Sequence, residues 1–309
     1  MTAHPRKTKS RTTTAALQLV VSSTLFALMA FGTKVVSARI PGSQAVAVRF
    51  ATGVAVTGIG WMLGRIVLRP QRWKWLVLRG LFGGTAALLY FMSIERVPVG
   101  VATLLNQTQP IYTLIFGWLL LREHPTRAAV LALPLTLSGV VLIVGVRMNQ
   151  FHLGSGEALG ILSAVLSGVA VTAIRAARRD ASDGQPGDTT WSVFFSFTLF
   201  GLVVTAPLVL PPLGHWVAPT PREWAWLLGL GLAGVSAQIV MTHALRHIGG
   251  ATAGIIAQLV VLLTIAGGVA FLDDHITLAF LAGGALTLAG VVLAVQSASP
   301  RQPPPVSVD

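Results

Sequence analysis

Residues 135–144, LTLSGVVLIV, return almost unchanged as residues 286–295, LTLAGVVLAV. Sliding the chain against itself by 151 residues aligns residues 80–145 with 231–296 without a gap, and about 20 of the 66 positions are identical. Shared composition does not explain so many identities, and we therefore predict two copies of one structural unit. The identical pairs include Gly80/Gly231, Gly83/Gly234, Ala102/Ala253, Gln107/Gln258, Thr113/Thr264 and Gly117/Gly268.

The composition around these repeats predicts a polytopic helical membrane protein. Of the 309 residues, 53% are hydrophobic and only 10% are charged, and the mean hydropathy is +0.74. A soluble domain is nearer a quarter charged. Apolar stretches long enough to cross a bilayer core of about 30 Å recur throughout the chain. The chain has no cysteine, which excludes disulfides, thiolate metal sites and cysteine nucleophiles.

Hydropathy predicts ten membrane spans joined by mostly short connections. The first apolar segment, about residues 15–36, resembles a signal peptide, but it is longer than the 7–15 residues of a signal core, and we predict a first transmembrane helix. The ten spans are about 14–36, 44–68, 75–94, 97–121, 126–146, 156–176, 190–211, 224–245, 250–272 and 276–297.

Five spans in each copy have a consequence for topology. Because five is an odd number, the second copy must enter the membrane from the opposite side, which is the inverted-repeat architecture of many secondary transporters. We predict one five-helix repeat over residues 14–146 and a second over 156–297. Residues 1–13 and the proline-rich residues 298–309 are predicted to be disordered cytoplasmic tails.

The distribution of positive charge predicts the orientation. With the N-terminus inside, sixteen Lys and Arg residues, Arg79 among them, lie at the cytoplasmic side and only four lie outside. This bias places both termini in the cytoplasm of a cell (inner) membrane protein. It also accounts for the net charge of +12, so we expect no nucleic-acid partner.

A polar stretch interrupts the fourth span, where residues 104–113 read LLNQTQPIYT. Buried amides in hydrocarbon turn toward a bundle interior or a wet cavity, and Pro110 kinks the helix because it removes one backbone hydrogen bond. An alternative is that these amides only bond between helices and that Pro110 is a plain kink. The predicted substrate-binding residues are Gln107, Gln258, Asn106, Tyr112, Gln238 and Arg49.

Charged residues inside the spans are few. Arg49 either pairs with Glu95 or forms a positive entrance for anionic groups, and Lys34 lies close enough to the boundary to snorkel. All acidic residues lie near helix ends or in loops. A midplane carboxylate is the usual coupling device for protons or sodium, so its absence favours a facilitator or exchanger and a neutral, zwitterionic or anionic solute over a cationic one.

Two motif-like strings carry no site. His243 and His247 have the i, i+4 spacing of a metal-binding pair, but no Asp, Glu or Cys lies beside them to complete it. Residues 229–234, GLGLAG, match a dinucleotide fingerprint, but they lie in a membrane span with no preceding strand. The glycines instead favour close helix packing, as at Gly80 and Gly84. We predict no metal and no cofactor.

The pattern resembles the drug/metabolite transporter superfamily, specifically its EamA-like branch. The resemblance rests on ten helices in two inverted repeats, on Arg49 before Phe50 in the second helix, and on Pro110 followed by Glu123 at the end of the fourth. It implies two pseudo-symmetric halves around a central cavity that move small metabolites by alternating access. Small multidrug members have a carboxylate in the first helix, and this chain has none there, which argues against proton-driven export of cationic drugs. Val261 and Asp274 replace Pro110 and Glu123 in the second copy.

These observations predict an integral membrane transporter, an exporter or facilitator of small polar metabolites. An enzyme is not expected, because neither GxSxG, HExxH nor paired buried carboxylates occur. The alternative is a membrane scaffold or sensor without flux. The expected partners are a small-molecule substrate and the lipid bilayer, with a homodimer as one candidate assembly.

Overall fold

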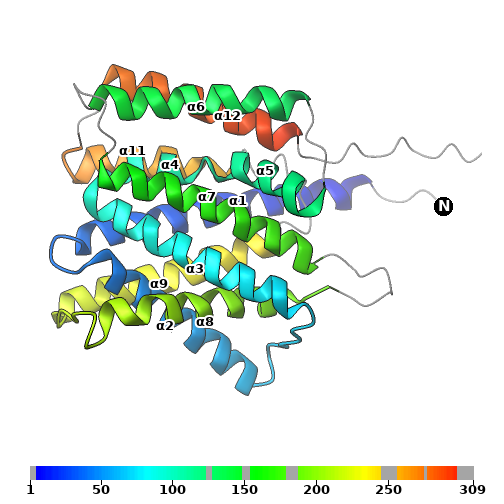
Figure 1. The fold of residues 1–309 in the computed structure, drawn as a ribbon. Helices are drawn as coiled ribbons and strands as arrows, with labels where there is room; N and C mark the ends of the chain where they lie inside the picture. Colours follow the sequence, from blue (N-terminus) through cyan, green and yellow to red (C-terminus); the bar gives the residue numbers. More distant parts are fainter. Residues whose placement is uncertain are drawn as a thin grey trace, which may run out of the picture.

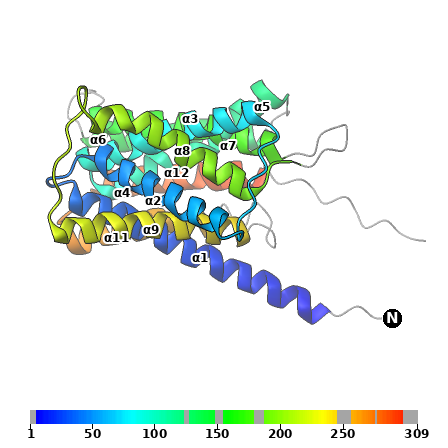
Figure 2. The same ribbon diagram turned by 90° about the horizontal axis from the view of Figure 1, so that it is seen from below.

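The computed structural model describes residues 5–122, 127–147, 154–178, 187–244, 256–274 and 277–297, and this part of the chain is helical without a strand. The helices are α1 (Pro5–Val36), α2 (Gly42–Met62), α3 (Trp73–Arg96), α4 (Val99–Asn106), α5 (Gln109–Leu121), α6 (Arg127–Arg147), α7 (Ser155–Arg178), α8 (Thr190–Val209), α9 (Pro221–Ala244), α11 (Leu259–Phe271) and α12 (Leu278–Ser297). Figures 1 and 2 show them packed side by side in one bundle. Helix α1 begins at Pro5, earlier than the predicted span, and residues 298–309 lie outside the described part.

Six helices are long and apolar enough to cross a membrane, namely α1, α2, α3, α7, α8 and α9. Helices α11 and α12 contain shorter apolar stretches. Large apolar side chains such as Leu131, Phe271 and Leu278 are exposed on the outside of the bundle. A soluble protein rarely exposes so much apolar surface, whereas a bilayer solvates it.

The predicted fourth span, residues 97–121, is divided in the structure. Helix α4 ends at Asn106, α5 begins at Gln109, and Gln107 and Thr108 form the turn between them. Pro110 lies in the first turn of α5, where its missing N–H is tolerated but the helix cannot continue backward. The polar stretch of the sequence is therefore a break between two half-helices.

The second copy has an equivalent break. Ile256 and Ala257 are helical, Gln258 is a turn, and α11 starts at Leu259. Val261 occupies the place of Pro110 here, so the break forms without a proline. Gln107 and Gln258, one in each copy, thus occupy equivalent positions between helical segments.

The packing of the two copies is symmetric. Helix α1 packs against α9 and α11, and its repeat mate α7 packs in the same way against α3 and α5. Helix α2 contacts its own mate α8, and α6 contacts its mate α12 along one edge of the bundle (Figure 1). Exchanging the copies leaves these contacts unchanged, as a pseudo-twofold axis between them requires.

Hydrogen bonds fix the directions of the helices. Ser93 near the end of α3 donates to the carbonyl of Gly156 at the start of α7 (2.8 Å), and Arg72 before α3 donates to Ala176 near the end of α7 (2.9 Å). Helices α3 and α7 are therefore antiparallel. Lys34 at the end of α1 donates to Ile94 at the end of α3 (2.9 Å), so α1 ends where α7, its repeat mate, begins.

Two glycines bring α3 and α8 into backbone contact. A Cβ atom added to Gly84 would lie 2.6 Å from the Cα of Gly201, and one added to Gly201 would lie 2.5 Å from the ring of Phe50. Phe50 and Phe91 are fully buried in the large apolar cluster that joins both copies. Small residues at a crossing allow this approach in a membrane, where close packing replaces the hydrophobic effect.

Candidate functional site

A cavity of about 310 Å³ lies between the two copies and is lined by both helix breaks. Its volume is at the lower end of the 300–1,000 Å³ range of ligand pockets, which fits one small solute. No Asp or Glu is found among the described residues that line it. Its polar lining consists of Ser22, Ser23, Arg49, Arg79, Tyr90, Thr103, Asn106, Gln107, Gln109, Ser167, Gln238 and Gln258.

The two repeat-mate glutamines meet in this cavity. Gln107 donates through Nε2 to the carbonyl of Ala257, next to Gln258, at 3.3 Å. Gln258 is buried and lines the same space. This bond joins the break in the first copy to the break in the second, so side-chain amides from both copies line one compartment.

Asn106 both lines the cavity and bonds between helices. Its Nδ2 donates to Ser163 Oγ on α7 at 2.8 Å, and Ser163 in turn donates to the carbonyl of Ala86 on α3 at 2.7 Å. The interhelical alternative considered from the sequence therefore applies to part of this side chain. Gln238 on α9 and Pro110 also line the cavity.

Tyr112 is placed elsewhere, away from the described lining of the cavity. It packs against α7, where a Cβ atom added to Gly168 would lie 2.5 Å from the Cβ of Tyr112. Residues 106–112 wind through more than a full turn, so the chain cannot direct all of them to one side. The structure thus brings together five of the six predicted binding residues: Gln107, Gln258, Asn106, Gln238 and Arg49.

Arg49 on α2 is 7% exposed and lies among aromatic rings. Its guanidinium carbon is 5.8 Å from the ring centres of Phe50 and Phe91 and 5.5 Å from that of Phe197. The Arg49–Glu95 ion pair considered from the sequence is not formed. Glu95 instead accepts a hydrogen bond of 2.8 Å from the backbone N–H of Gly42 at the start of α2.

Sequence reasoning missed Arg79, which it counted among the cytoplasmic charges. Arg79 on α3 is 9% exposed, lines the cavity, and lies 4.3 Å from the centre of the Phe197 ring. Its Nε is buried without a hydrogen-bond partner among the described residues. Two signals were present: Arg79 falls inside the predicted span 75–94, and a glycine, Gly83, follows one helical turn later.

A second hollow of about 240 Å³ adjoins the cavity and shares Arg79 and Gln238 with it. It extends to Arg178 at the end of α7, Thr190 at the start of α8 and His243 near the end of α9. The cavity therefore continues toward this end of the bundle. The described residues contain no cluster able to hold a metal, while His247 and Glu123 lie outside the described part.

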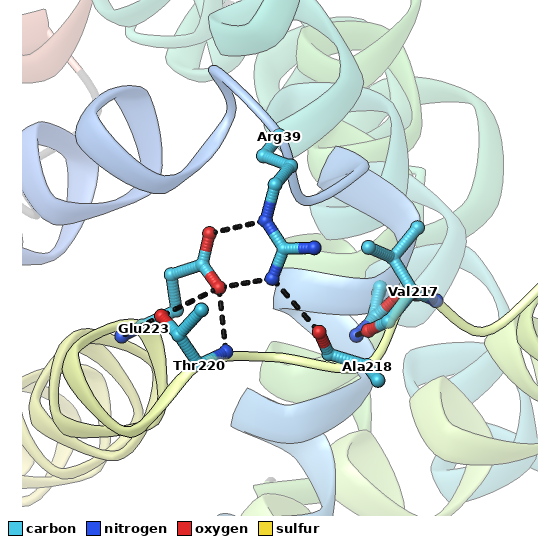
Figure 3. A network of polar contacts seen from close by, with 6 residues as sticks. Arg39, Val217, Ala218, Thr220 and Glu223 are labelled. Carbon is cyan, nitrogen blue, oxygen red and sulfur yellow. Dashed lines mark hydrogen bonds and ion pairs between the residues drawn. The ribbon is translucent and has the colours of Figure 1, made fainter.

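The opposite end of the bundle is held together by polar contacts between two connections (Figure 3). Arg39, between α1 and α2, forms a two-pronged ion pair with Glu223 at the start of α9 and donates to the carbonyl of Ala218 at 2.8 Å. Glu223 also accepts from the N–H of Thr220 at 2.7 Å. We call these four residues the Arg39 network. The hydrogen bond to Glu223 raises the pKa of Arg39 above its usual value.

Two further polar side chains reinforce this end. Gln44 is fully buried and makes two bonds to the backbone of Val217: its Nε2 donates to the carbonyl (2.8 Å) and its Oε1 accepts from the N–H (3.0 Å). Lys34, predicted to snorkel, donates to the carbonyls of Ile94 and Val97, both at 2.9 Å. It therefore caps the C-terminus of α3, where a cation is favourable.

One family model and several known proteins match this chain. A model of the EamA-like transporter family matches residues 13–145 and again residues 154–296. The pseudopaline exporter CntI of Pseudomonas aeruginosa is 29% identical over 237 residues, which cover 75% of this chain and 78% of that protein. An uncharacterized transporter of Helicobacter pylori is 31% identical over 188 residues, 60% of each chain. Solute carrier family 35 member G1 of Homo sapiens is 29% identical over 182 residues, covering 55% of this chain and 48% of that protein.

A solved crystal structure of another protein has the same fold, with a TM-score of 0.59 and 22% sequence identity over 92% of this chain and 97% of that one. The apolar helices and the relatives named as transporters identify a multi-pass membrane transporter. Because the family model matches both copies of the repeat and so most of the chain, this protein belongs to the EamA-like transporter family.

Proposed function

We propose that the protein moves small polar metabolites across the cell membrane by alternating access, as an exporter or facilitator. The observation that carries this proposal is one cavity of about 310 Å³ lined by the helix breaks of both copies. Broken helices at an interface between repeats are the usual place of a transporter's substrate site. In this proposal Gln107, Gln258, Asn106 and Gln238 offer hydrogen bonds to the solute, with Arg49 beside them.

The architecture that goes with this function has ten spans in two inverted five-helix repeats, residues 14–146 and 156–297. The symmetric packing and the opposite directions of α1 and α7 support it. The excess of Lys and Arg supports cytoplasmic termini. In that orientation the second hollow faces the cytoplasm and the Arg39 network faces outward, so this structure represents a state closed to the outside.

Transport then requires the Arg39 network to separate. Outward opening would part the connection between α1 and α2 from the one between α8 and α9, because Arg39 and Gln44 hold them together. The exposed Arg39–Glu223 ion pair contributes little stability, about 0–1 kcal/mol, so the ion pair itself is a small barrier to this separation. A repeat-against-repeat rocking motion of this kind is how inverted-repeat carriers alternate.

Purified protein in liposomes tests the proposal through counterflow of a panel of radiolabelled small polar solutes. At least one solute should exchange, and the Gln107→Leu/Gln258→Leu double variant should lose that exchange while keeping the helical content and melting behaviour of the wild type. Gly229→Ala, on an open helix face with no atom within 4 Å of the added Cβ, is the matched control and should exchange normally.

Unchanged exchange in the double glutamine variant would refute the site. A complete lack of flux, with no solute stabilising the protein, would favour the alternative of a scaffold or sensor. The cysteine-free chain also permits single-cysteine labelling to test orientation. A cysteine at Ala218 should react with a membrane-impermeant maleimide from outside the cell, and one at Arg178 should not.

A further inference from the structure

The cavity contains two buried cations that the proposed transport of polar solutes does not explain. Arg49 on α2 and Arg79 on α3 are 7% and 9% exposed, and both line it. Both guanidinium carbons lie within 5.5 Å of the centre of the same ring, Phe197. Two like charges on one aromatic ring repel each other, and buried charges are normally paired with a counter-ion.

The described part of the protein supplies no counter-ion to either arginine. Its acidic residues lie near helix ends or in connections, and none lines the cavity. Glu223, for example, pairs with Arg39 at the opposite end of the bundle. Arg79 Nε is buried and makes no hydrogen bond to any described residue. The donors of these two side chains are thus available to something outside the chain.

The local packing holds both guanidinium groups in place. The guanidinium carbon of Arg49 lies over the rings of Phe50, Phe91 and Phe197, and that of Arg79 lies over Phe197. These cation–π contacts hold the charges without occupying an oxygen acceptor. Two glycines make room behind them. A Cβ atom added to Gly234 would lie 2.7 Å from Arg49 Nε, and one added to Gly83 would collide with Arg79 Nη1.

These two glycines are repeat mates at the 151-residue offset. Each copy of the repeat therefore contributes one side-chain-free position to accommodate one arginine. Packing of the bundle alone does not call for two buried arginines with a glycine beside each. Apolar side chains such as leucine at these positions would stabilise the bundle without the cost of two desolvated charges. Two arginines placed in this way are what a site for a negatively charged ligand between the copies requires.

From this arrangement we infer that Arg49 and Arg79 bind the oxyanion group of the transported solute, so that the substrate is a small organic carboxylate or a related oxyanion. The planar fork of each guanidinium matches a carboxylate or phosphate in a two-pronged fashion. The amides of Gln107 and Gln258 lie in the same cavity to bind the neutral remainder of the solute. This inference rests on the proposed transport function and specifies its substrate class.

Thermal unfolding of the full-length protein in lipid nanodiscs tests the inference without requiring flux. The probes are succinate, glutarate, inorganic phosphate and sulfate, with the diamides succinamide and glutaramide as uncharged counterparts of the two carboxylates. At least one oxyanion should raise the melting temperature in a saturable way, and its amide counterpart should not. If none of the four oxyanions stabilises the protein, or if the amides stabilise it equally, the inference is wrong.

Arginine variants locate the binding. Arg49→Gln and Arg79→Gln should each weaken oxyanion binding by roughly 10- to 100-fold, the range expected when a hydrogen-bonded charge is removed. Arg65→Gln removes an exposed charge in the connection after α2 and is the matched control, with unchanged affinity expected. If a glutamine variant does not fold, Gly234→Ala keeps both charges but displaces Arg49, and it should weaken the same binding. Wild-type affinity in these variants would overturn the assignment.

The two proposals fail in different ways. Suppose that oxyanion binding depends on Arg79 but that proteoliposomes show no flux of any solute. This result would refute transport and leave the anion site intact. Exchange of neutral solutes by a protein that none of the four oxyanions stabilises would support transport and overturn the anion site.

Discussion

Replacing Gly84 by alanine should destabilise the bundle at the crossing of α3 and α8. The added Cβ would lie 2.6 Å from Gly201 Cα and 2.9 Å from its backbone nitrogen, whereas carbon atoms in contact lie about 3.5–4.0 Å apart. The helices must therefore separate by about 1 Å, because the obstructing atoms are backbone and cannot rotate away. Overpacking of this kind costs about 1–3 kcal/mol, and alanine recovers about 0.8–1.0 kcal/mol of helix propensity over glycine.

Because the obstructing atoms are backbone, we expect an overpacking cost in the upper half of this range, about 2–3 kcal/mol. Subtracting the propensity gain of about 1 kcal/mol leaves a net loss of about 1–2 kcal/mol of unfolding free energy. Gly229→Ala is the matched control. It lies in α9 with nothing within 4 Å of the added Cβ, so it should stabilise the protein by up to about 1 kcal/mol.

Denaturant titration of both variants in bicelles, followed by circular dichroism, measures the difference. A Gly84→Ala protein as stable as Gly229→Ala would show that α3 and α8 do not touch through their backbones. The crossing also sets the geometry of the cavity, because Arg79 precedes Gly84 on α3 and Phe197 precedes Gly201 on α8. Gly84→Ala should therefore also weaken solute binding in the nanodisc assay.

The remaining predictions concern the end of the bundle that contains the Arg39 network and the first helix break. Gln44→Leu leaves the N–H and carbonyl of Val217 without their side-chain partner. The free energy of unfolding should fall by about 1–3 kcal/mol in the same denaturation assay, and an unchanged midpoint would refute the stabilising role of these two hydrogen bonds. Pro110→Ala should change stability by less than about 1 kcal/mol, because the second copy breaks without proline; loss of folding would contradict this. Arg39→Gln should speed the labelling of a cysteine at Met29 by an impermeant maleimide, and equal rates would show that the Arg39 network does not hold this end closed.

The amino-acid sequence by itself determined the class of the fold. Apolar length and the lack of charge are properties of each segment alone, so helices α1–α3 and α7–α9 were predictable without knowing their neighbours. The internal repeat was also predictable from the sequence, because identical residues recur at a constant offset of 151 positions. The amides beside Pro110 indicated an interruption in the fourth span, since proline acts on its own backbone.

Tertiary structure alone decided which side chains share the cavity. The sequence predicted Arg79 to be one of the cytoplasmic positive charges, and only the packing of α8 places it against Phe197. Tyr112 follows the polar stretch directly, yet α5 turns it toward Gly168. No proline in the sequence predicts the break at Gln258, because Val261 occupies the position of Pro110. Arg39 and Glu223 pair although 184 residues separate them in the chain. Facing directions and long-range contacts depend on how every helix is rotated in the bundle, which no local pattern encodes.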